Sequence, residues 1–352
     1  MKILYIAWSK QNPNEIYADP SVWYRCYQPA QALRDLGHTA NVIAAKLVTN
    51  EHIEAHDCII FFRPLYSKGF VELVNLCAQI NKRYIASYDD LFFDIGHLRN
   101  SGFRKLNAPQ EQILNDRPEL YAKAFYFFDE FISSTDGLKK AILKHKPGAK
   151  VNIHYNGIPP ETCDWAQFLS KIDHSKARRI GYFAGGAIHT PDLLKIAPVL
   201  MQVLNEQNAI FYCVETVQIP DILLSTGRIE TTPRLNYSRM LHAYSNCRVT
   251  IAPLEINDFT NSKSGIKFLE SASVGNNVVA TPIDDILRVG NEMLFPAVTE
   301  DDWYKQLTHA INYEFEADDL KRNVNLLAEK HSTKSEALNF LAELNTKTSK
   351  SS

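Results

Sequence analysis

Short apolar runs alternate along the chain with longer segments in which apolar residues recur at helical spacing. In the first half this pattern predicts helices over residues 22–36, 69–81, 118–128 and 136–146. Between them we expect strands at Ile3–Trp8, Thr39–Ala44, Cys58–Phe62, Tyr84–Tyr88, Glu130–Ser133 and Val151–Tyr155. This alternation is typical of β-α units around a parallel sheet.

The same alternation begins again near residue 179. It predicts strands at Arg179–Phe183, Ile210–Val214, Arg228–Thr231, Val249–Pro253 and Asn277–Ala280. Helices are expected over residues 191–206, 236–245, 264–274 and 301–314. We therefore expect an α/β protein with two Rossmann-like domains, over 1–158 and 178–328, and a crevice at the carboxyl ends of their strands.

Three other segments complete the expected organisation. Residues 159–178 show no strand pattern and are the predicted linker. The polar stretch 94–118 is long enough to suggest a functional loop. An amphipathic helix over 332–345 is expected to complete the first domain.

Composition narrows the class of protein. The 352 residues are 45% hydrophobic and 22% charged, as in ordinary globular proteins. The net charge of −2 gives no general attraction to nucleic acid, and no basic stripe carries interleaved aromatics, so nucleic-acid binding is not expected. There is no apolar run of about 18 residues and no signal-peptide pattern, so we expect a cytoplasmic protein.

The cysteine pattern argues against a metal centre. The six cysteines form no CxxC pair, and no Cys/His cluster has ligand spacing. We expect reduced thiols, no metal and no cofactor.

The most informative segment runs from the Val249–Pro253 strand through a polar loop into the next helix. Ser264 is a candidate N-cap, and Gly265 leaves space for a ligand near the first helical amides. Lys263 and Lys267 add positive charge to this anion site, with Glu270 one turn further on. The simpler alternative is a capped surface helix with a Lys267–Glu270 pair.

This stretch resembles the donor-binding region of GT-B-fold glycosyltransferases, in particular the family 4-like group (glycosyl transferases group 1). The matching residues are Pro253-Leu254, Ser264, Lys267, Glu270, Ser271-Ala272-Ser273-Val274-Gly275 and Val278-Val279-Ala280-Thr281-Pro282. Weaker similarities are Tyr155-Asn156-Gly157-Ile158, which resembles the end of a first domain, and Arg179–Gly186, which resembles the start of a second.

The resemblance implies a GT-B fold, with two Rossmann-like domains facing each other across a cleft. It also implies that Glu270 binds the ribose of a nucleotide-sugar donor and that the amides of Ser264 and Gly265 bind its phosphates. The loop that contains Gly185, Gly186 and His189 would lie on the donor side.

Two positions depart from the family pattern. Ser262 stands where the family has the first of two paired glutamates, and the usual Arg/Lys pair after the first strand of the second domain is missing. Lys263 and His189 are our candidates to replace this positive charge. The alternatives are a solvated loop lysine and a structural loop histidine.

Four polar residues follow predicted strands of the first domain or begin its first helix. Asp89 and Asp90 form an acid pair that could raise one carboxyl pKa and handle a proton of the acceptor. Arg25 and Arg63 suit phosphate or carboxylate on the acceptor side. The alternatives are a turn or N-cap for the acids and surface ion pairs for the arginines. In retaining enzymes of this family the leaving phosphate is thought to take the acceptor's proton, so the acids would then position the acceptor.

A basic helix over residues 138–146 has a narrow apolar stripe. It could touch anionic lipid heads at the inner face of a membrane, or it could be a solvated basic surface.

We therefore expect a glycosyltransferase of the hexosyltransferase type that acts on a glycan or lipid-linked acceptor. The resemblance implies retention and a role in surface polysaccharide or glycoconjugate assembly. Two alternatives stay open: a sugar-nucleotide 2-epimerase of the same fold, and a two-lobed non-catalytic binding protein.

Overall fold

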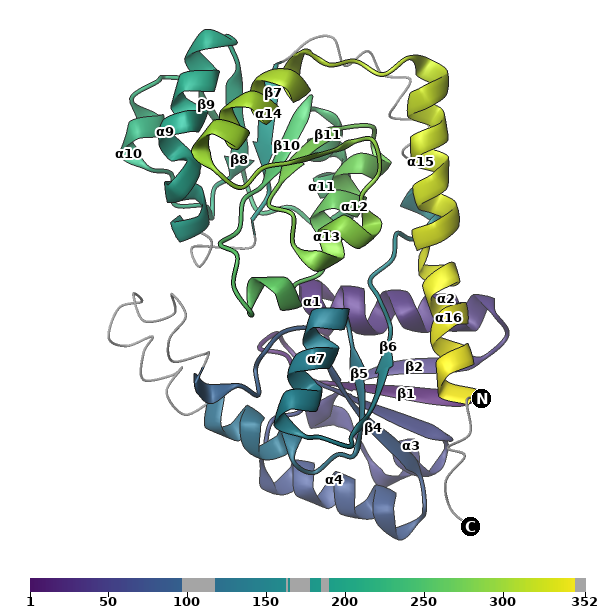
Figure 1. Cartoon of the computed structure of the whole chain (residues 1–352). Helices are drawn as coiled ribbons and strands as arrows, with labels where there is room; N and C mark the ends of the chain where they lie inside the picture. Colours follow the sequence, from purple (N-terminus) through teal and green to yellow (C-terminus); the bar gives the residue numbers. More distant parts are fainter. Residues whose placement is uncertain (97–117, 163, 165–177, 185–189, 346–352) are drawn as a thin grey trace. The chain divides into compact units, whose positions relative to one another are not determined.

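The computed structural model describes residues 1–96, 118–162, 164, 178–184 and 190–345 (Figure 1). These residues form two compact units. The first unit contains residues 1–157, the short segment Asn261–Ser264 and the described residues from Thr333 onward. The second contains the described residues of 158–260 and Gly265–Ser332. Gly185, Gly186, His189 and most of the predicted linker and long loop lie outside the described residues.

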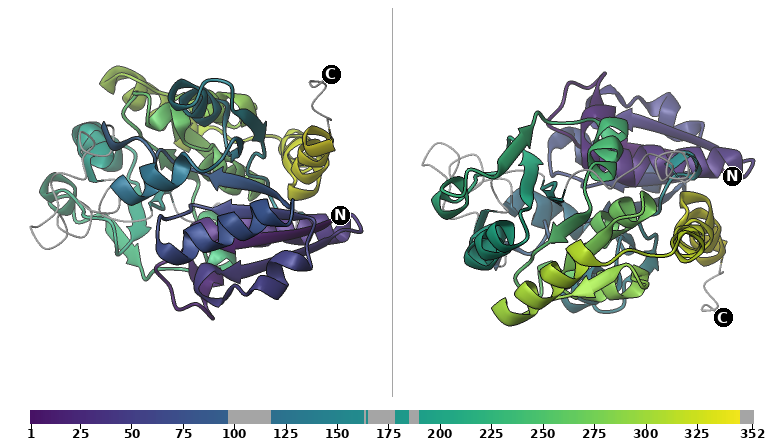
Figure 2. Two further views of the ribbon diagram at one scale, coloured as in Figure 1. Left: turned by 90° about the horizontal axis from the view of Figure 1, so that it is seen from below. Right: turned by 90° about the horizontal axis from the view of Figure 1, so that it is seen from above.

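The first unit is built on a six-stranded sheet in the order β2-β1-β3-β4-β5-β6, in which every described pair is parallel. Its strands are β1 Lys2–Ala7, β2 Thr39–Ala44, β3 Cys58–Phe62, β4 Arg83–Tyr88, β5 Glu130–Ser133 and β6 Lys150–Ile153. The central strand β3 is apolar throughout and completely buried, because helices cover both faces of a parallel sheet. Two further views show helices on both sides of each sheet (Figure 2).

The helices of the first unit connect and cover these strands. They are the 3-10 turns η1 Ile16–Ala18 and η3 Ala45–Leu47, the π-helical turn η2 Trp23–Tyr27, and the α-helices α1 Pro20–Val22, α2 Gln28–Asp35, α3 Asn50–Glu54, α4 Lys68–Gln79, residues 118–125, α7 Asp136–His145 and α16 Thr333–Asn345. On one face, Tyr5 and Ile60 of the strands pack with Phe340 of α16 and with α2. On the other face, the ring of Phe61 lies 6.2 Å from that of Phe70 in α4.

The second unit has a second six-stranded sheet, in the order β12-β11-β10-β7-β8-β9, and its described pairs are again parallel. The strands are β7 Arg179–Tyr182, β8 Ile210–Val214, β9 Ile229–Thr232, β10 Val249–Ala252, β11 Asn277–Ala280 and β12 Leu294–Pro296. The helices are α9 Thr190–Glu206, α10 Asp221–Leu224, α11 Tyr237–Ser245, α12 Ile266–Ser273, α13 Asp284–Val289, α14 Glu300–Asn312 and α15 Ala317–His331. The 3-10 turn η6 Thr260–Ser262 begins at Thr260 of this unit and continues into the segment Asn261–Ser264 of the first.

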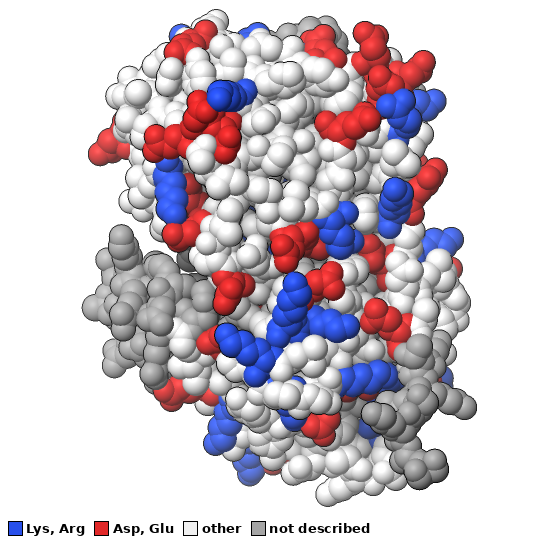
Figure 3. All heavy atoms as spheres, viewed as in Figure 1, with Lys and Arg blue, Asp and Glu red and all other residues white. Residues whose placement is uncertain are grey.

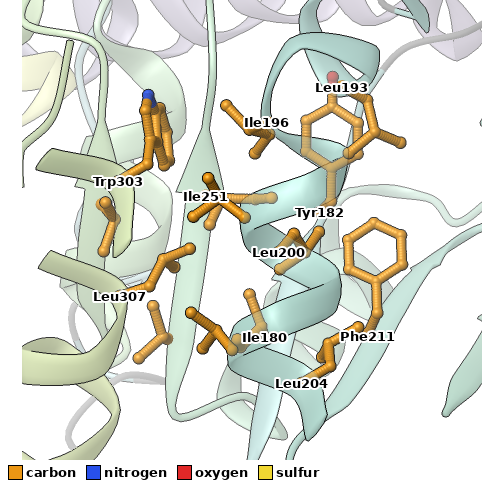
Figure 4. Close-up of a cluster of buried hydrophobic side chains, with 14 of the residues drawn as sticks. Ile180, Tyr182, Leu193, Ile196, Leu200, Leu204, Phe211, Ile251, Trp303 and Leu307 are labelled. Carbon is orange, nitrogen blue, oxygen red and sulfur yellow. The ribbon is translucent and has the colours of Figure 1, made fainter. Parts of the chain in front are cut away.

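A large apolar core lies between the second sheet and helices α9 and α14 (Figure 4). Leu200 of α9, Ile180 of β7 and Leu307 of α14 are completely buried there. The opposite face of the sheet packs against α12, α13 and α15 through residues such as Phe268 and Leu327. The α/β architecture with two parallel sheets is therefore confirmed.

The structure differs from the sequence-based prediction in several places, among them the short helices α3, α10 and α13, which were not predicted. The expected helix over 22–36 is divided into α1, the π-helical turn and α2, which the hydrophobic pattern does not distinguish. Helix α15 and the short strand β12 were not predicted. Helix α15 is rich in charged residues and buries only Asn323, Val324 and Leu327, so its apolar pattern is weak.

The cysteines of the described part of the chain are buried thiols without disulfides. Burial raises the pKa of Cys58, Cys77 and Cys213 to about 12. Such thiols are poor nucleophiles near neutral pH, because the reactive species is the thiolate.

The segment Asn261–Ser264 packs on the start of α7 within the first unit. The Thr135 hydroxyl, which also caps α7, donates to the carbonyl oxygen of Ser262 at 2.8 Å. A Cβ atom at Gly137 would lie 2.1 Å from the carbonyl oxygen of Asn261. The glycine is therefore needed for the close approach of the segment to the helix.

This packing gives a matched pair of substitutions. Gly137→Ala should destabilise the protein, because the new methyl group must displace the Asn261 backbone. Gly69→Ala is the control, since Gly69 also occupies the second position of a helix and has nothing within 4 Å of its Cβ position. It should be neutral or stabilising by up to about 1 kcal/mol. Urea unfolding of both variants tests this, and equal stability would contradict the close approach.

Candidate functional site

The start of α12 differs from the sequence-based prediction. The N-cap is Gly265, not Ser264, so the predicted capping role of Ser264 is wrong. The Gly265 amide donates to the Asp285 carboxylate at 2.6 Å, and Asp285 is 4% exposed. A Cβ atom at Gly265 would lie 2.8 Å from the Asp285 carbonyl oxygen, so packing against α13 already requires a glycine here. The anion that bonds to this helix start is therefore the carboxylate of Asp285, a group of the protein itself.

Asp285 has a second partner on its own helix. Its other carboxylate oxygen accepts from Arg288 Nε at 2.6 Å. The bond to Gly265 thus links the start of α12 to α13, and the bond to Arg288 within α13 holds the carboxylate in place. The sequence pattern did not point to Asp285, because a partner 20 residues away is brought close only by the tertiary fold.

Lys267 lies at the carboxyl end of the second sheet. Its ammonium nitrogen is 5.6 Å from the ring centre of Tyr182, the last residue of β7. This edge of a parallel sheet is where Rossmann-like folds bind nucleotides. A partly buried lysine at this edge of the sheet is suited to bind a phosphate group.

Glu270 is buried, with 3% of its surface exposed, on the same helix. The Tyr244 hydroxyl of α11 donates to its carboxylate at 3.4 Å. Burial raises the pKa of Tyr244 well above its ordinary value, and the neighbouring carboxylate raises it further. Tyr244 therefore stays protonated and can donate to the carboxylate of Glu270. Sequence reasoning missed Tyr244, whose only signal is a tyrosine on an apolar helix face.

In the first unit, Arg63 and Asp89 form a close pair at the ends of β3 and β4. Arg63 donates to both carboxylate oxygens of Asp89, at 2.6 and 2.7 Å, and to the Ser21 hydroxyl at 2.9 Å. Its guanidinium also lies 4.4 Å from the ring centre of Phe92. Burial opposes the charge of Arg63, but the Asp89 carboxylate outweighs this and raises the pKa of Arg63. This bidentate geometry holds the two side chains in a fixed arrangement.

The backbone of Arg63 is unusual. It has a φ of 48°, in the left-handed region that residues with a side chain seldom occupy. Such strain persists only where surrounding contacts fix it, and it is often found at functional sites.

Asp90 contacts a different cationic side chain from the one that binds its neighbour Asp89. Its Oδ2 lies 3.6 Å from Lys263 Nζ, and its Oδ1 accepts from the Leu91 amide at 3.1 Å. Lys263 reaches this position from the segment Asn261–Ser264. The two adjacent acids thus face separate cations.

Arg25 is not a surface residue. It is 2% exposed, and Nη1 donates to the His154 carbonyl oxygen at 2.6 Å and to Asn156 Oδ1 at 2.8 Å. Burial lowers the pKa of Arg25, although Asp89 opposes this shift. The amide of Asn156 in turn donates to Ser264 Oγ at 3.0 Å. A surface ion pair is therefore the wrong interpretation of Arg25.

The predicted site residues thus fall into two groups. The first unit brings together Arg25, Arg63, Asp89, Asp90, Lys263 and Ser264. The second unit places Gly265, Lys267 and Glu270 at the start and along one face of α12. The sequence did not reveal the partners of three site residues: Asn156 for Ser264, Tyr244 for Glu270 and Asp285 for Gly265. The predicted donor-side residues Gly185, Gly186 and His189 lie outside the described residues.

Two searches of the described residues were negative. No group of three or more histidine, cysteine, aspartate or glutamate side chains in them could hold a metal ion. None of the helices in the described ranges is long and apolar enough to cross a membrane.

No protein-family model matches the sequence, and no curated protein matches it significantly. Solved structures do match over nearly the whole chain. HepE of Anabaena in complex with UDP has a TM-score of 0.62 and 11% identity, over 98% of this chain and 100% of that one. Sucrose-phosphate synthase of Thermosynechococcus elongatus has a TM-score of 0.57 and 11% identity, over 98% of both chains.

A third similar structure is WaaG, a glycosyltransferase involved in lipopolysaccharide biosynthesis. It has a TM-score of 0.55 and 12% identity, over 98% of this chain and 100% of that one. The likeness to these structures, together with the two parallel sheets, establishes the fold. The chain has the GT-B fold, as predicted from the sequence.

The link between Gly265 and Asp285 leads to a stability prediction. Asp285→Asn removes one acceptor oxygen and the charge, and should destabilise the protein by about 1–3 kcal/mol. Asp284→Asn is the control, because Asp284 is the exposed neighbour on the same helix. Urea unfolding should show a clear loss for Asp285→Asn only. Equal midpoints would mean that Asp285 does not secure the start of α12.

Proposed function

We propose that the protein is a glycosyltransferase that takes its sugar from a nucleotide-sugar donor. The observation that carries this proposal is the placement of Lys267 and Glu270 on α12 at the carboxyl end of the second sheet, within a GT-B fold. A cation and a buried carboxylate on one helix suit the two polar parts of a nucleotide, its diphosphate and its ribose.

The two side chains have distinct roles. A carboxylate can accept two hydrogen bonds from adjacent ribose hydroxyls. The Tyr244 hydroxyl donates to one oxygen of the Glu270 carboxylate, at 3.4 Å. Lys267 offsets the charge that builds up on the diphosphate as the glycosidic bond breaks. Because HepE was crystallised with UDP and with UDP-glucose, the uridine series is our first candidate for the donor.

The residues of the first unit are assigned to the acceptor. The Arg63–Asp89 pair forms a rigid polar surface, with Asp90 and Lys263 beside it. Asp90 would orient an acceptor hydroxyl, and Lys263 would stabilise the leaving phosphate, which takes the proton itself. This chemistry needs neither a metal nor a cofactor. Retention, a cytoplasmic location and a role in polysaccharide or glycoconjugate assembly are parts of the same proposal.

Thermal-shift measurements test the donor site directly. We expect stabilisation by one series among UDP-, GDP-, dTDP-, CMP- and ADP-linked sugars, and its loss in Glu270→Gln. Glu336→Gln is the matched control, since Glu336 is an equally buried glutamate, 3% exposed, on α16 of the first unit. If none of the nucleotide sugars stabilises the protein, the result contradicts the proposal and favours a two-lobed binding protein. Turnover of UDP-GlcNAc without an acceptor would instead reveal a 2-epimerase.

Contact with a membrane is the remaining part of the proposal, and helix α7 is its candidate surface. Leu138 and Ile142 are completely buried, so the apolar stripe of α7 belongs to the core. Lysine and arginine side chains gather in the region of α7 on the face shown in Figure 3, with acidic groups among them. Any attachment of α7 to lipid must therefore be electrostatic.

Vesicle flotation distinguishes this kind of attachment from insertion. Vesicles rich in phosphatidylglycerol should capture the protein at low salt and release it at about 1 M salt, where the Debye length is about 3 Å. Lys140→Glu with Lys144→Glu should abolish the capture, since both lysines are exposed. Capture that survives high salt would contradict an electrostatic contact, and no capture at low salt would remove the membrane from the proposal.

A further inference from the structure

Three side chains of the first unit form a continuous hydrogen-bonded relay. Arg25 Nη1 donates to Asn156 Oδ1 at 2.8 Å, and Asn156 Nδ2 donates to Ser264 Oγ at 3.0 Å. These residues come from the π-helical turn, from the segment after β6 and from the segment Asn261–Ser264. The relay therefore joins three parts of the chain that are far apart in sequence.

The chemistry of arginine fixes the direction of the relay. A guanidinium can only donate, so the Asn156 atom that faces it must be the oxygen. The Asn156 nitrogen is then directed at Ser264, whose hydroxyl accepts in this bond. The hydrogen of the Ser264 hydroxyl consequently points away from Asn156. A charged group at one end thus determines how a hydroxyl is presented at the other.

The burial of the relay argues that Arg25 and Asn156 do not touch a ligand themselves. Arg25 is 2% exposed and Asn156 is 8% exposed. Arg25 also donates to the His154 carbonyl oxygen at 2.6 Å, so Nη1 is committed to the protein. Burying a guanidinium without a directly bonded carboxylate is costly, which suggests that the arrangement is kept for what it positions.

Ser264 is the exposed end of the relay, half-buried and directly before the N-cap of α12. We propose that Asn156, oriented by Arg25, is a positioning residue that sets the Ser264 hydroxyl toward the diphosphate of the donor. This inference rests on the proposed function, because it assumes that a nucleoside diphosphate binds at the start of α12. It reassigns Arg25 from a phosphate contact to the anchor of the relay.

The test compares ligands with and without the diphosphate. Binding of UDP, GDP, dTDP and ADP and of the matching nucleosides is measured by titration calorimetry, with the nucleosides measured by competition. Asn156→Ala should weaken diphosphate binding on the order of tenfold, the effect of one hydrogen bond to a charged group. Nucleoside binding should be unchanged, because Ser264 is assigned to the phosphates alone. A purely structural role would weaken both ligands together.

A double-mutant cycle shows whether Asn156 acts through Ser264. In a Ser264→Ala background, Asn156→Ala should cause no further loss of diphosphate affinity, whereas independent residues would give additive losses. Asn156→Asp is the isosteric variant that protects the test against misfolding. It keeps the bond to Arg25 but can only accept, so it reverses the bond to Ser264 and should weaken diphosphate binding at least as much as alanine.

Asn152→Ala is the matched control. Asn152 is 3% exposed and lies on β6, four residues before Asn156, but its amide donates to Glu130 instead. It should leave the ratio of diphosphate to nucleoside affinity unchanged. If the wild-type protein binds a diphosphate and Asn156→Ala and Asn156→Asp bind it equally well, the relay is not a positioning device, although the proposed function stands. If the wild type binds no nucleoside diphosphate, both proposals fail.

Discussion

Two hydrogen bonds define the start of α12, and the candidate site depends on them. Asn156 donates to the Ser264 hydroxyl within the first unit, and the Gly265 amide donates to Asp285 within the second. The two bonds therefore hold consecutive residues. Every role that we assign to Ser264, Lys267 and Glu270 assumes that this helix begins at a fixed place. The helix dipole alone would not provide that, because its effect falls off within the first turn and it does not fix the residue at which the helix begins.

The charged groups of the first unit are ordered by pairing. Asp89 is bound at two points by Arg63, whereas Asp90 and Lys263 are separated by 3.6 Å. The close Arg63–Asp89 pair is suited to keep the local structure fixed. The longer contact between Asp90 and Lys263 is easier to rearrange when a substrate binds. This difference is why we propose that Asp90 orients the acceptor and Lys263 stabilises the leaving phosphate, rather than giving either role to Asp89.

Much of the fold could be predicted from the sequence, because parallel strands buried on both faces leave uninterrupted apolar runs. Cys58–Phe62 and Asn277–Ala280 were predicted with the bounds that the structure shows. Helix α15 could not be predicted in this way, since it is mostly charged and buries few residues. The π-helical turn at Trp23–Tyr27 has the same apolar spacing as the helix around it.

The candidate site was less accessible to sequence reasoning. The burial of Arg25 and Glu270 depends on long-range packing, which a local pattern cannot report. The N-cap was misassigned because Ser264 has the right chemistry locally, while its hydroxyl is held by Asn156 and the helix begins one residue later. Asp285 supplies the anion that the helix start attracts, and nothing in the segment around Gly265 indicates that such a partner exists.

A crystal structure of the protein with a bound nucleoside diphosphate, UDP first, tests the central claim most directly. Our interpretation predicts the ribose hydroxyls within hydrogen-bonding distance of the Glu270 carboxylate and the diphosphate beside Lys267. A nucleotide bound away from α12, or its absence at saturating concentration across the nucleotide series, would contradict the assignment of this helix to the donor.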